Sequence, residues 1–130
     1  MACLETTFLI DLLRGKQNVA SLKEELNATE ATLVIAAPSI MELWSGACLS
    51  DMPAKEKEKI KALYESFEVL PLDARSAEES GEIEADLAKK GLPIETEDTM
   101  IAGIALSRGE KVVTRDEHYA RIPGLKVLKY

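Results

Sequence analysis

Four acidic side chains stand where a parallel sheet would bring them together. Glu5 directly follows a short apolar run of strand length, and Asp116 comes two residues after another such run. Glu42 lies early in a helix predicted after a third run, and Asp98 opens a further predicted helix. Open parallel α/β sheets bind their ligands beyond the carboxyl ends of the strands. We therefore expect these four acids to converge at one edge of the sheet.

Carboxylates that converge in this way repel one another, and such a cluster persists when cations neutralise it. Oxygen ligands suit Mg²⁺ or Mn²⁺, so the pattern predicts a divalent-metal site held by Glu5, Glu42, Asp98 and Asp116. Each acid also has a simpler interpretation when it is taken alone. Asp98 could cap its helix, and Asp116 could form a turn. Glu42 could be a solvated surface residue, and Glu5 could only complement the dipole of the following helix.

Three other polar residues near these acids carry weaker signals. Thr114 ends an apolar run, where its hydroxyl could orient a carboxylate or a water, or where it could simply be a β-branched strand residue. His118 is the one histidine of the chain and lies in a polar turn, so we expect no direct catalytic role for it. Asp11 lies between Phe8 and Leu12 in a helical stretch, and we expect it at the surface or beside a ligand rather than as a ligand.

Short apolar runs alternate along the chain with longer segments of helical periodicity, which is typical of a parallel sheet covered by helices on both faces. Pro38 ends one continuous apolar run at a point where a helix can begin. Ser76 with Glu79 has the pattern of a capping box, opening a helix that ends at Gly91. We expect one α/β domain over residues 1–130, with about six helices and about five strands, at 2–4, 32–37, 67–70, 111–114 and 125–128.

Length and composition agree with one globular domain. The 130 residues suffice for one core, and 46% apolar with 30% charged residues argue against disorder. No apolar run approaches the roughly 20 residues that span a bilayer, and the N-terminus lacks a signal-peptide layout, so we expect a cytoplasmic protein without a membrane segment. Cys3 and Cys48 belong to no Cys/His array, so we expect both to be reduced and buried, without a disulfide or zinc site.

The net charge of −7 is unusual for a nucleic-acid-binding protein, which normally presents a basic face to phosphates. Residues 65–98 hold 3 basic and 11 acidic side chains, whereas residues 99–130 hold 6 basic and 3 acidic ones. The last quarter of the chain is therefore locally basic. We expect a phosphate backbone to approach it there, with Arg115, and Lys111 or Arg121, as candidate RNA contacts.

Four segments in order resemble the motifs of the PIN-domain family, specifically those of VapC-type toxins. Leu4–Gly15 resembles the first motif, in which an acidic and a hydroxyl residue follow the first strand. Met41–Ala47 is similar to the second, a helix that carries one acid. Gly91–Ala102 resembles the third and Val112–Tyr119 the fourth, and Ile122–Val127 fits the family's ending. The resemblance covers nearly the whole chain, and four motifs in order are far more specific than any one.

This resemblance implies a three-layer α/β/α fold with a short, mostly parallel central sheet. It implies a metal-dependent endoribonuclease whose catalytic residues are Glu5, Glu42, Asp98, Asp116 and Thr114, the four acids holding Mg²⁺ or Mn²⁺. Cleavage through such ions leaves a 5′-phosphate and a 3′-hydroxyl. Membership also implies homodimerisation and a small DNA-binding antitoxin whose peptide occupies the cleft and suppresses cleavage of RNA.

Glu5 is the one departure from the family pattern, which generally has Asp at this position. The extra carbon lengthens the reach of the carboxylate by roughly 1.5 Å. This change predicts a weakened metal site, and it leaves open a second hypothesis, a catalytically impaired PIN-fold module that binds RNA or protein.

Two further chemistries fit the sequence poorly. A receiver-like signalling domain shares the doubly wound plan, but it needs an acidic pair at the first strand and a phosphorylatable Asp beyond a middle strand. Neither appears at residues 34–35 or 69–70. Metal-free RNA cleavage commonly uses two histidines, and this chain has His118 alone.

Overall fold

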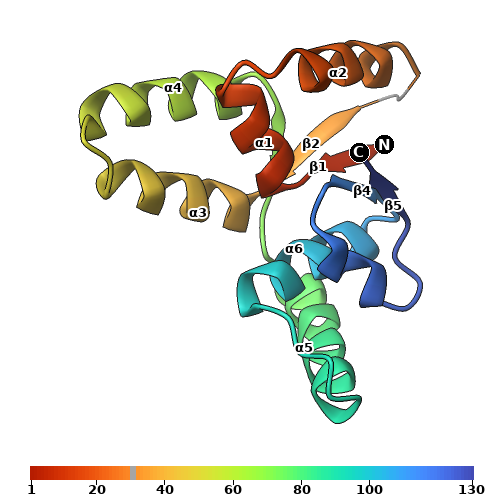
Figure 1. The fold of residues 1–130 in the computed structure, drawn as a ribbon. Coiled ribbons are helices and arrows are strands. Elements are labelled where there is room, and N and C mark those ends of the chain that lie inside the picture. Colours follow the sequence, from red (N-terminus) through yellow and green to blue (C-terminus); the bar gives the residue numbers. More distant parts are fainter. Residues whose placement is uncertain (30–31) are drawn as a thin grey trace.

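A computed structural model of the chain describes residues 1–29 and 32–130. Its elements alternate as the sequence predicts, and all five strands form one parallel sheet in the order β3-β2-β1-β4-β5 (Figure 1). The strands are β1 (Ala2–Leu4), β2 (Leu33–Ala36), β3 (Glu68–Leu70), β4 (Lys111–Thr114) and β5 (Val127–Lys129). The helices are α1 (Thr6–Leu13), α2 (Gln17–Thr29), α3 (Ala37–Cys48), α4 (Pro53–Glu65), α5 (Ala74–Lys89), α6 (Thr96–Ser107) and the 3₁₀ helix η1 (Glu117–Arg121).

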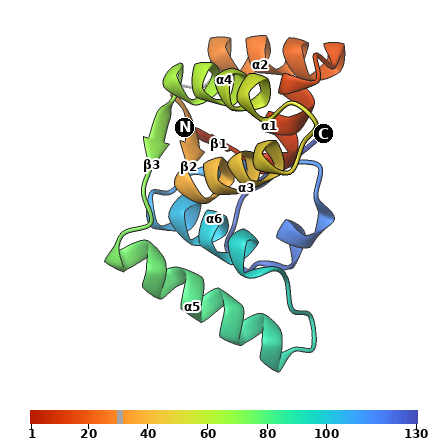
Figure 2. The same ribbon diagram turned by 90° about the vertical axis from the view of Figure 1, so that its left-hand side faces the viewer.

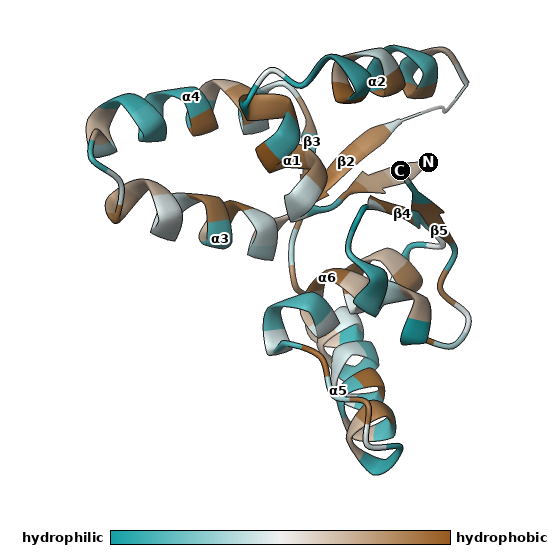
Figure 3. Cartoon of the chain, in the orientation of Figure 1, coloured by the Kyte–Doolittle hydropathy of each residue, from teal (hydrophilic) through white to brown (hydrophobic). Residues whose placement is uncertain are grey.

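Helices cover both faces of the sheet, which confirms the three-layer α/β/α prediction (Figures 1 and 2). Successive strand residues point to opposite faces. Cys3 accordingly packs with the core cluster under α5, α6 and η1, whereas Ala2 and Leu4 pack with the cluster under α1 to α4. The outward sides of α4 and α5 are hydrophilic, as Figure 3 shows. The Lys/Glu-rich helix α4 is therefore amphipathic, with Ile60 on its buried side.

The central strand β1 fixes where the acidic residues meet. It pairs in parallel with β2 and with β4, and its last residue Leu4 lies opposite Val113. Glu5 therefore leaves the sheet beside the end of β4, and its backbone N–H donates to the carbonyl of Val113 at 3.1 Å. The ends of β1, β2 and β4 are neighbours, so the residues that follow these strands share one edge of the sheet.

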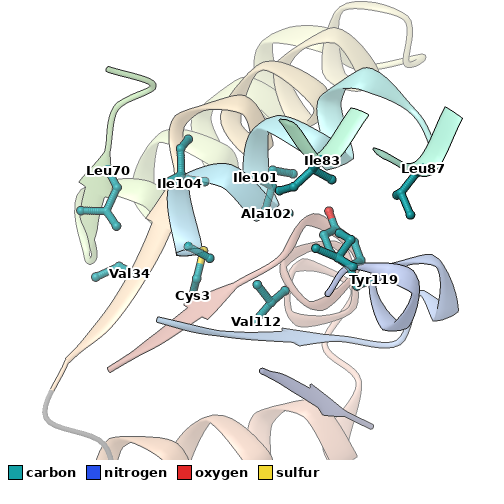
Figure 4. Packing of buried hydrophobic residues seen from close by; sticks show 13 residues of the cluster. Cys3, Val34, Leu70, Ile83, Leu87, Ile101, Ala102, Ile104, Val112 and Tyr119 are labelled. Atoms are coloured by element: carbon teal, nitrogen blue, oxygen red, sulfur yellow. The ribbon is translucent and has the colours of Figure 1, made fainter. Parts of the chain in front are cut away.

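The helix α6 packs against this same sheet and α5 packs closely against α6, with Ile83 and Leu87 of α5 and Ile101 of α6 in one buried cluster (Figure 4). Gly103 of α6 lies against α5: a Cβ placed there would clash with the hydroxyl of Ser80 and lie 2.8 Å from the Ser80 backbone nitrogen. The absence of a side chain at Gly103 is what permits this approach.

Four sequence-based expectations need correction in detail. The helix α5 begins at Ala74 because Asp73 and Ser76 form its capping box, so the predicted Ser76–Glu79 box does not start it. The last strand begins two residues later than predicted, at Val127.

The third correction concerns α6, which begins at Thr96, so Asp98 lies within its first turn instead of opening it. The fourth is that Cys48 is exposed, whereas Cys3 is buried as expected. Within the described residues, no helix is both long and apolar enough to cross a membrane.

Candidate active site

The four predicted acids come from four different parts of the chain. Glu5 follows β1, Glu42 lies in the second turn of α3, Asp98 lies in the first turn of α6, and Asp116 follows β4. Their charges act on one another: those of Glu5 and Asp116 raise the pKa of both Glu42 and Asp98. The structure thus places the four acids within range of one another's charge.

Glu5 is 2% exposed and forms the N-cap of α1. Its Oε2 accepts hydrogen bonds from the backbone N–H of Thr7 at 2.9 Å and from the Thr7 hydroxyl at 2.6 Å. The Thr114 hydroxyl donates to the same oxygen at 2.7 Å. These three donors occupy Oε2, whereas Oε1 lies 3.5 Å from the Tyr119 hydroxyl, which donates to Asp98. Glu5 therefore both caps α1 and lies near another of the acids.

Thr114 is fully buried and connects two of the acids. Its hydroxyl donates to Glu5 and accepts from the backbone N–H of Asp116 at 2.9 Å. The prediction that Thr114 orients a carboxylate agrees with this geometry. The β-branched strand interpretation also holds, because Thr114 is the last residue of β4.

Glu42 is held by a residue that sequence reasoning did not single out. The hydroxyl of Thr6 lies 2.8 Å from Glu42 Oε1 and 2.9 Å from the hydroxyl of the fully buried Ser39. Burial raises the pKa of Glu42, although the Thr6 hydrogen bond lowers it in part. Glu42 is half-buried, so its interpretation as a plain surface residue is wrong.

Asp98 is the acid whose ionisation is most strongly disfavoured. Burial raises the pKa of Asp98 to about 7, although a hydrogen bond from Tyr119 lowers it in part. The negative charges of Glu5, Asp116 and Glu42 act in the same direction as burial. A carboxyl group with such neighbours is a typical functional-site candidate, because a bound cation would reverse the penalty.

Asp116 forms the N-cap of η1 and lies at the exposed side of the cluster. Its Oδ1 accepts from the backbone N–H of His118 at 2.9 Å and lies 3.0 Å from His118 Nδ1. One ligand atom each from Asp98, Asp116 and His118 lies within 4.8 Å of the others, so these three residues could hold a metal ion together. The turn-forming role of Asp116 is thus compatible with metal binding, and His118 is closer to the acids than its position in the sequence suggested.

Of the two positions expected for Asp11, at the surface or beside a ligand, the surface is wrong. Asp11 is 1% exposed, and its carboxylate accepts from Arg115 Nε at 2.8 Å and from the Tyr130 hydroxyl at 2.8 Å. Lys16 Nζ lies 3.0 Å from its other oxygen. Burial raises the pKa of Asp11, but these hydrogen bonds outweigh burial and hold the pKa well below its usual range. Asp11 is a buried anchor for cationic side chains outside the acidic cluster.

The three candidate RNA contacts differ in their position relative to the acidic site. Arg115 is next to the acidic site, and 45% of its side chain is exposed although its guanidinium is paired with Asp11. Arg121 donates to the carbonyl of Pro93 at 3.3 Å. Lys111 starts β4, so it lies at the opposite end of the strand from the acids. Of these three residues, Arg115 has the placement that an RNA contact at this site needs.

The arrangement agrees with one known protein family. A model of the PIN domain matches residues 2–125. The chain belongs to the PIN-domain family. This PIN domain is 36% identical over 124 residues to the tRNA(fMet)-specific endonuclease VapC of Shigella flexneri, covering 95% of this chain and 92% of the relative. It is 34% identical over 125 residues to the protein of the same name from Salmonella typhimurium, covering 95% and 93%.

Solved structures confirm the fold of this PIN domain. A chain of the DNA-bound VapBC of Salmonella typhimurium superimposes with a TM-score of 0.89 at 33% identity, covering 99% of this chain and 98% of that one. A chain of VapBC2 from Rickettsia felis, bound to a DNA fragment from its promoter, gives a TM-score of 0.91 at 24% identity, with coverage of 99% and 98%.

The residues of this PIN domain fit a divalent cation. Glu42 and Asp98 both have a pKa raised by burial and by neighbouring acids, a tension that a cation relieves. Among the residues that the structure describes, Oε1 of Glu5 accepts no hydrogen bond shorter than the 3.5 Å contact with Tyr119, and Asp116 adds a partly exposed carboxylate. Carboxylate oxygens of this kind are the ligands that Mg²⁺ and Mn²⁺ prefer.

Proposed function

We propose that this PIN domain is a divalent-metal-dependent endoribonuclease and the toxin of a VapBC-type toxin–antitoxin pair. The observation that carries the proposal is the convergence of Glu5, Glu42, Asp98 and Asp116 at the carboxyl ends of β1, β2 and β4. The relatives named as tRNA(fMet)-specific endonucleases support RNA as the substrate class. Such an activity belongs in the cytoplasm, where those RNAs are found.

Glu42, Asp98 and Asp116 would hold Mg²⁺ or Mn²⁺, with Oε1 of Glu5 as the fourth carboxylate ligand. A divalent ion supplies activation of the attacking water and neutralisation of charge on the phosphate. Hydrolysis forms a bond between the water oxygen and phosphorus and breaks the bond to O3′, which takes up a proton. The products are a 5′-phosphate and a 3′-hydroxyl.

The protein's own contribution is to hold the acids in place. Thr114 fixes both Glu5 and the backbone of Asp116, and Thr6 fixes Glu42. These hydrogen bonds hold the carboxylates at a defined separation before any ion arrives, which lowers the cost of ordering them. Arg115 lies beside Asp116 with much of its side chain in solvent, and we assign it contact with the RNA backbone.

The partner would be a small DNA-binding antitoxin, as in the VapBC complexes that this chain resembles. A groove of about 540 Å³ between α1, α3 and α4 supports this assignment, because its apolar side chains lie beside the charged Arg14, Glu56 and Lys59, a combination that suits an amphipathic peptide segment. Its apolar lining consists of Ile10, Leu13, Leu43, Ala47 and Ile60. The helices α1 and α3 also carry Thr6 and Glu42, so an antitoxin segment bound here would lie against elements of the active site. We also propose that the protein forms a homodimer.

A second candidate function rests on Glu5. Its Oε2 is occupied by donors from Thr7 and Thr114, so a single oxygen remains for an ion. If that oxygen binds too weakly, the domain binds RNA or its protein partner without cutting RNA.

Cleavage assays separate the two functions. Purified protein is incubated with tRNA and with single-stranded DNA of matched sequence, in Mn²⁺, in Mg²⁺ and in EDTA. The nuclease proposal expects RNA products with 5′-phosphate ends in the presence of metal and none in EDTA. RNA that is bound but left intact in every metal supports the binding module, and cleavage that persists in EDTA contradicts the metal-dependent mechanism.

A further inference from the structure

Tyr119 places a hydroxyl group between two of the acids. This residue of η1 is fully buried, and its ring packs in the core cluster with Leu87, Ile101 and Val112 (Figure 4). Its hydroxyl donates to Asp98 Oδ1 at 3.1 Å and lies 3.5 Å from Glu5 Oε1. Packing in the core accounts for a buried aromatic ring at this position. It does not account for the buried hydroxyl group, which phenylalanine would lack.

The hydroxyl acts as a donor toward both acids. Burial and the charges of Glu5 and Asp98 raise the pKa of Tyr119 well above its usual value, so the phenol keeps its proton. One proton can be donated to one carboxylate at a time, and the shorter distance favours Asp98. Tyr119 thus links the acid that follows β1 to the acid on α6, two elements that are far apart in the sequence.

We propose that Tyr119 is a positioning residue for the metal site, whose hydroxyl holds the Asp98 carboxylate in the orientation that ligation requires. This inference rests on the proposed metal-dependent function. Oδ1 of Asp98 is held by the phenol, so the other oxygen is presented to the ion. Without the hydroxyl, Asp98 can rotate away from Glu5 under their mutual repulsion, and reordering it then weakens the binding of the ion.

The substitution Tyr119→Phe tests this role because it keeps the ring in the core and removes the hydroxyl alone. Tyr130→Phe is a matched control, since it removes a hydroxyl that donates to the buried carboxylate of Asp11 at 2.8 Å, outside the acidic cluster. Mn²⁺ binding is measured by isothermal titration calorimetry at pH 8 without RNA. Thermal unfolding in EDTA is measured alongside, so that a loss of folding is seen separately.

We expect Tyr119→Phe to raise the Mn²⁺ dissociation constant by about tenfold or more, the usual effect of removing a partner of a metal ligand. Tyr130→Phe should leave that constant within about twofold of wild type, since its hydroxyl contacts Asp11 and Thr7 but no proposed ligand. Equal Mn²⁺ affinity for wild type and Tyr119→Phe would overturn the inference, whatever happens to the melting temperature in EDTA.

Tighter binding by Tyr119→Phe would overturn it as well, because the hydroxyl would then compete with the ion for Asp98. The result for wild type separates this inference from the function on which it rests. Wild-type protein that binds no Mn²⁺ contradicts the proposed metal site itself, whereas wild-type binding that Tyr119→Phe leaves unchanged contradicts the role of Tyr119 alone.

Should Tyr119→Phe not fold, Asp98→Glu replaces it in the same comparison. Moving this carboxylate by one bond disrupts the hydrogen bond from the other side and should also raise the Mn²⁺ dissociation constant. Unchanged affinity in that variant would equally contradict a requirement for the fixed orientation of Asp98.

Discussion

Thr114 donates a hydrogen bond of 2.7 Å to Oε2 of Glu5, a residue 109 positions away in the sequence. The bond joins the end of β4 to the end of β1, and the same hydroxyl accepts the backbone N–H of Asp116. One threonine side chain therefore sets the distance between two of the four acids, Glu5 and Asp116. Through this threonine, the spacing of these two acids is set by the sheet itself.

The raised pKa of Asp98 predicts that metal affinity depends on pH. Its carboxyl group titrates at about 7 in the folded protein, so a proton competes with the ion below that pH. We expect the apparent affinity for Mn²⁺ to rise by up to about tenfold per pH unit from about pH 5.5 to 7 and to level off above it. Calorimetric titrations at several pH values measure this, and a flat profile across pH 7 would contradict it.

The raised pKa of Asp98 also predicts how the stability of the folded protein changes with pH. The folded-state pKa of Asp98 lies above its ordinary value of 3.8, so the folded state keeps this proton where the unfolded state has lost it. The contribution of Asp98 to the stability of the metal-free protein is therefore present below about pH 4 and is lost as the pH rises through 7. Saturating Mn²⁺ should remove this loss, which thermal unfolding with and without metal would reveal.

The substitution Glu5→Asp should raise the cleavage rate at limiting metal concentration. Aspartate remains a good N-cap for α1, and shortening the side chain draws its charge back from Asp98. We expect a severalfold higher single-turnover cleavage rate at limiting Mn²⁺, on the order of the effects seen when ligand geometry improves. Glu5→Gln, which keeps the length and removes the charge, should be slower than wild type. An aspartate variant no faster than wild type means that Glu5 already serves well.

Arg115→Ala should lower stability as well as RNA affinity. Arg115 is a hydrogen-bond partner of the buried Asp11 carboxylate. Its removal leaves Asp11 to Lys16 and Tyr130, which costs about 1–3 kcal/mol and several degrees of melting temperature. Arg115→Lys keeps the charge and should recover part of both losses. Melting curves and RNA binding over a salt series measure the two effects, and an unchanged melting temperature for Arg115→Ala argues against this role in the fold.

Gly103→Ala should destabilise the contact between α5 and α6. Its Cβ would meet the Ser80 hydroxyl and lie 2.7 Å from the Ser76 carbonyl oxygen, so the helices must separate at a cost of about 1–3 kcal/mol. Gly81→Ala is the matched control, because Gly81 lies in α5 with nothing within 4 Å of the added Cβ. That variant should gain about 0.5–1 kcal/mol from helix propensity. Chemical denaturation measures the free energy of unfolding of both variants. Equal changes in the two variants would contradict the close approach of α5 and α6.

The fold could be predicted from the sequence because apolar runs and helical periodicity together indicate a parallel sheet covered by helices. Continuous apolar runs mark strands buried on both faces, and the parallel topology then brings the residues after β1 and β4 together. Glu5 and Asp116 could be placed in one site on this argument alone. The start of α5 was misjudged, because Ser76 can act either as the N-cap of a helix or as the third residue of one that Asp73 caps. The backbone geometry decides between the two in favour of Asp73.

The partners of the acids were beyond the reach of sequence patterns. Thr6, Ser39 and Tyr119 act through side-chain hydrogen bonds that depend on rotamers and on the distance between elements. A pair of threonines after Glu5 was the one available signal, and it does not indicate that Thr6 reaches Glu42 while Thr7 turns back to Glu5. The burial of Asp11 was not predictable because Arg115, its hydrogen-bond partner, comes from a distant part of the chain.

The central claim, that the acidic cluster cuts RNA with a bound metal, is tested most directly by single-turnover cleavage with Asp98→Asn in Mn²⁺. Asparagine keeps the oxygen that accepts from Tyr119 and removes the charge, so the variant should fold. Glu95→Gln, on an exposed residue three positions earlier without a capping hydrogen bond, is the matched control. We predict that Asp98→Asn lowers the cleavage rate by more than about a hundredfold while Glu95→Gln retains the wild-type rate. A folded Asp98→Asn protein that cleaves RNA at the wild-type rate would contradict the account.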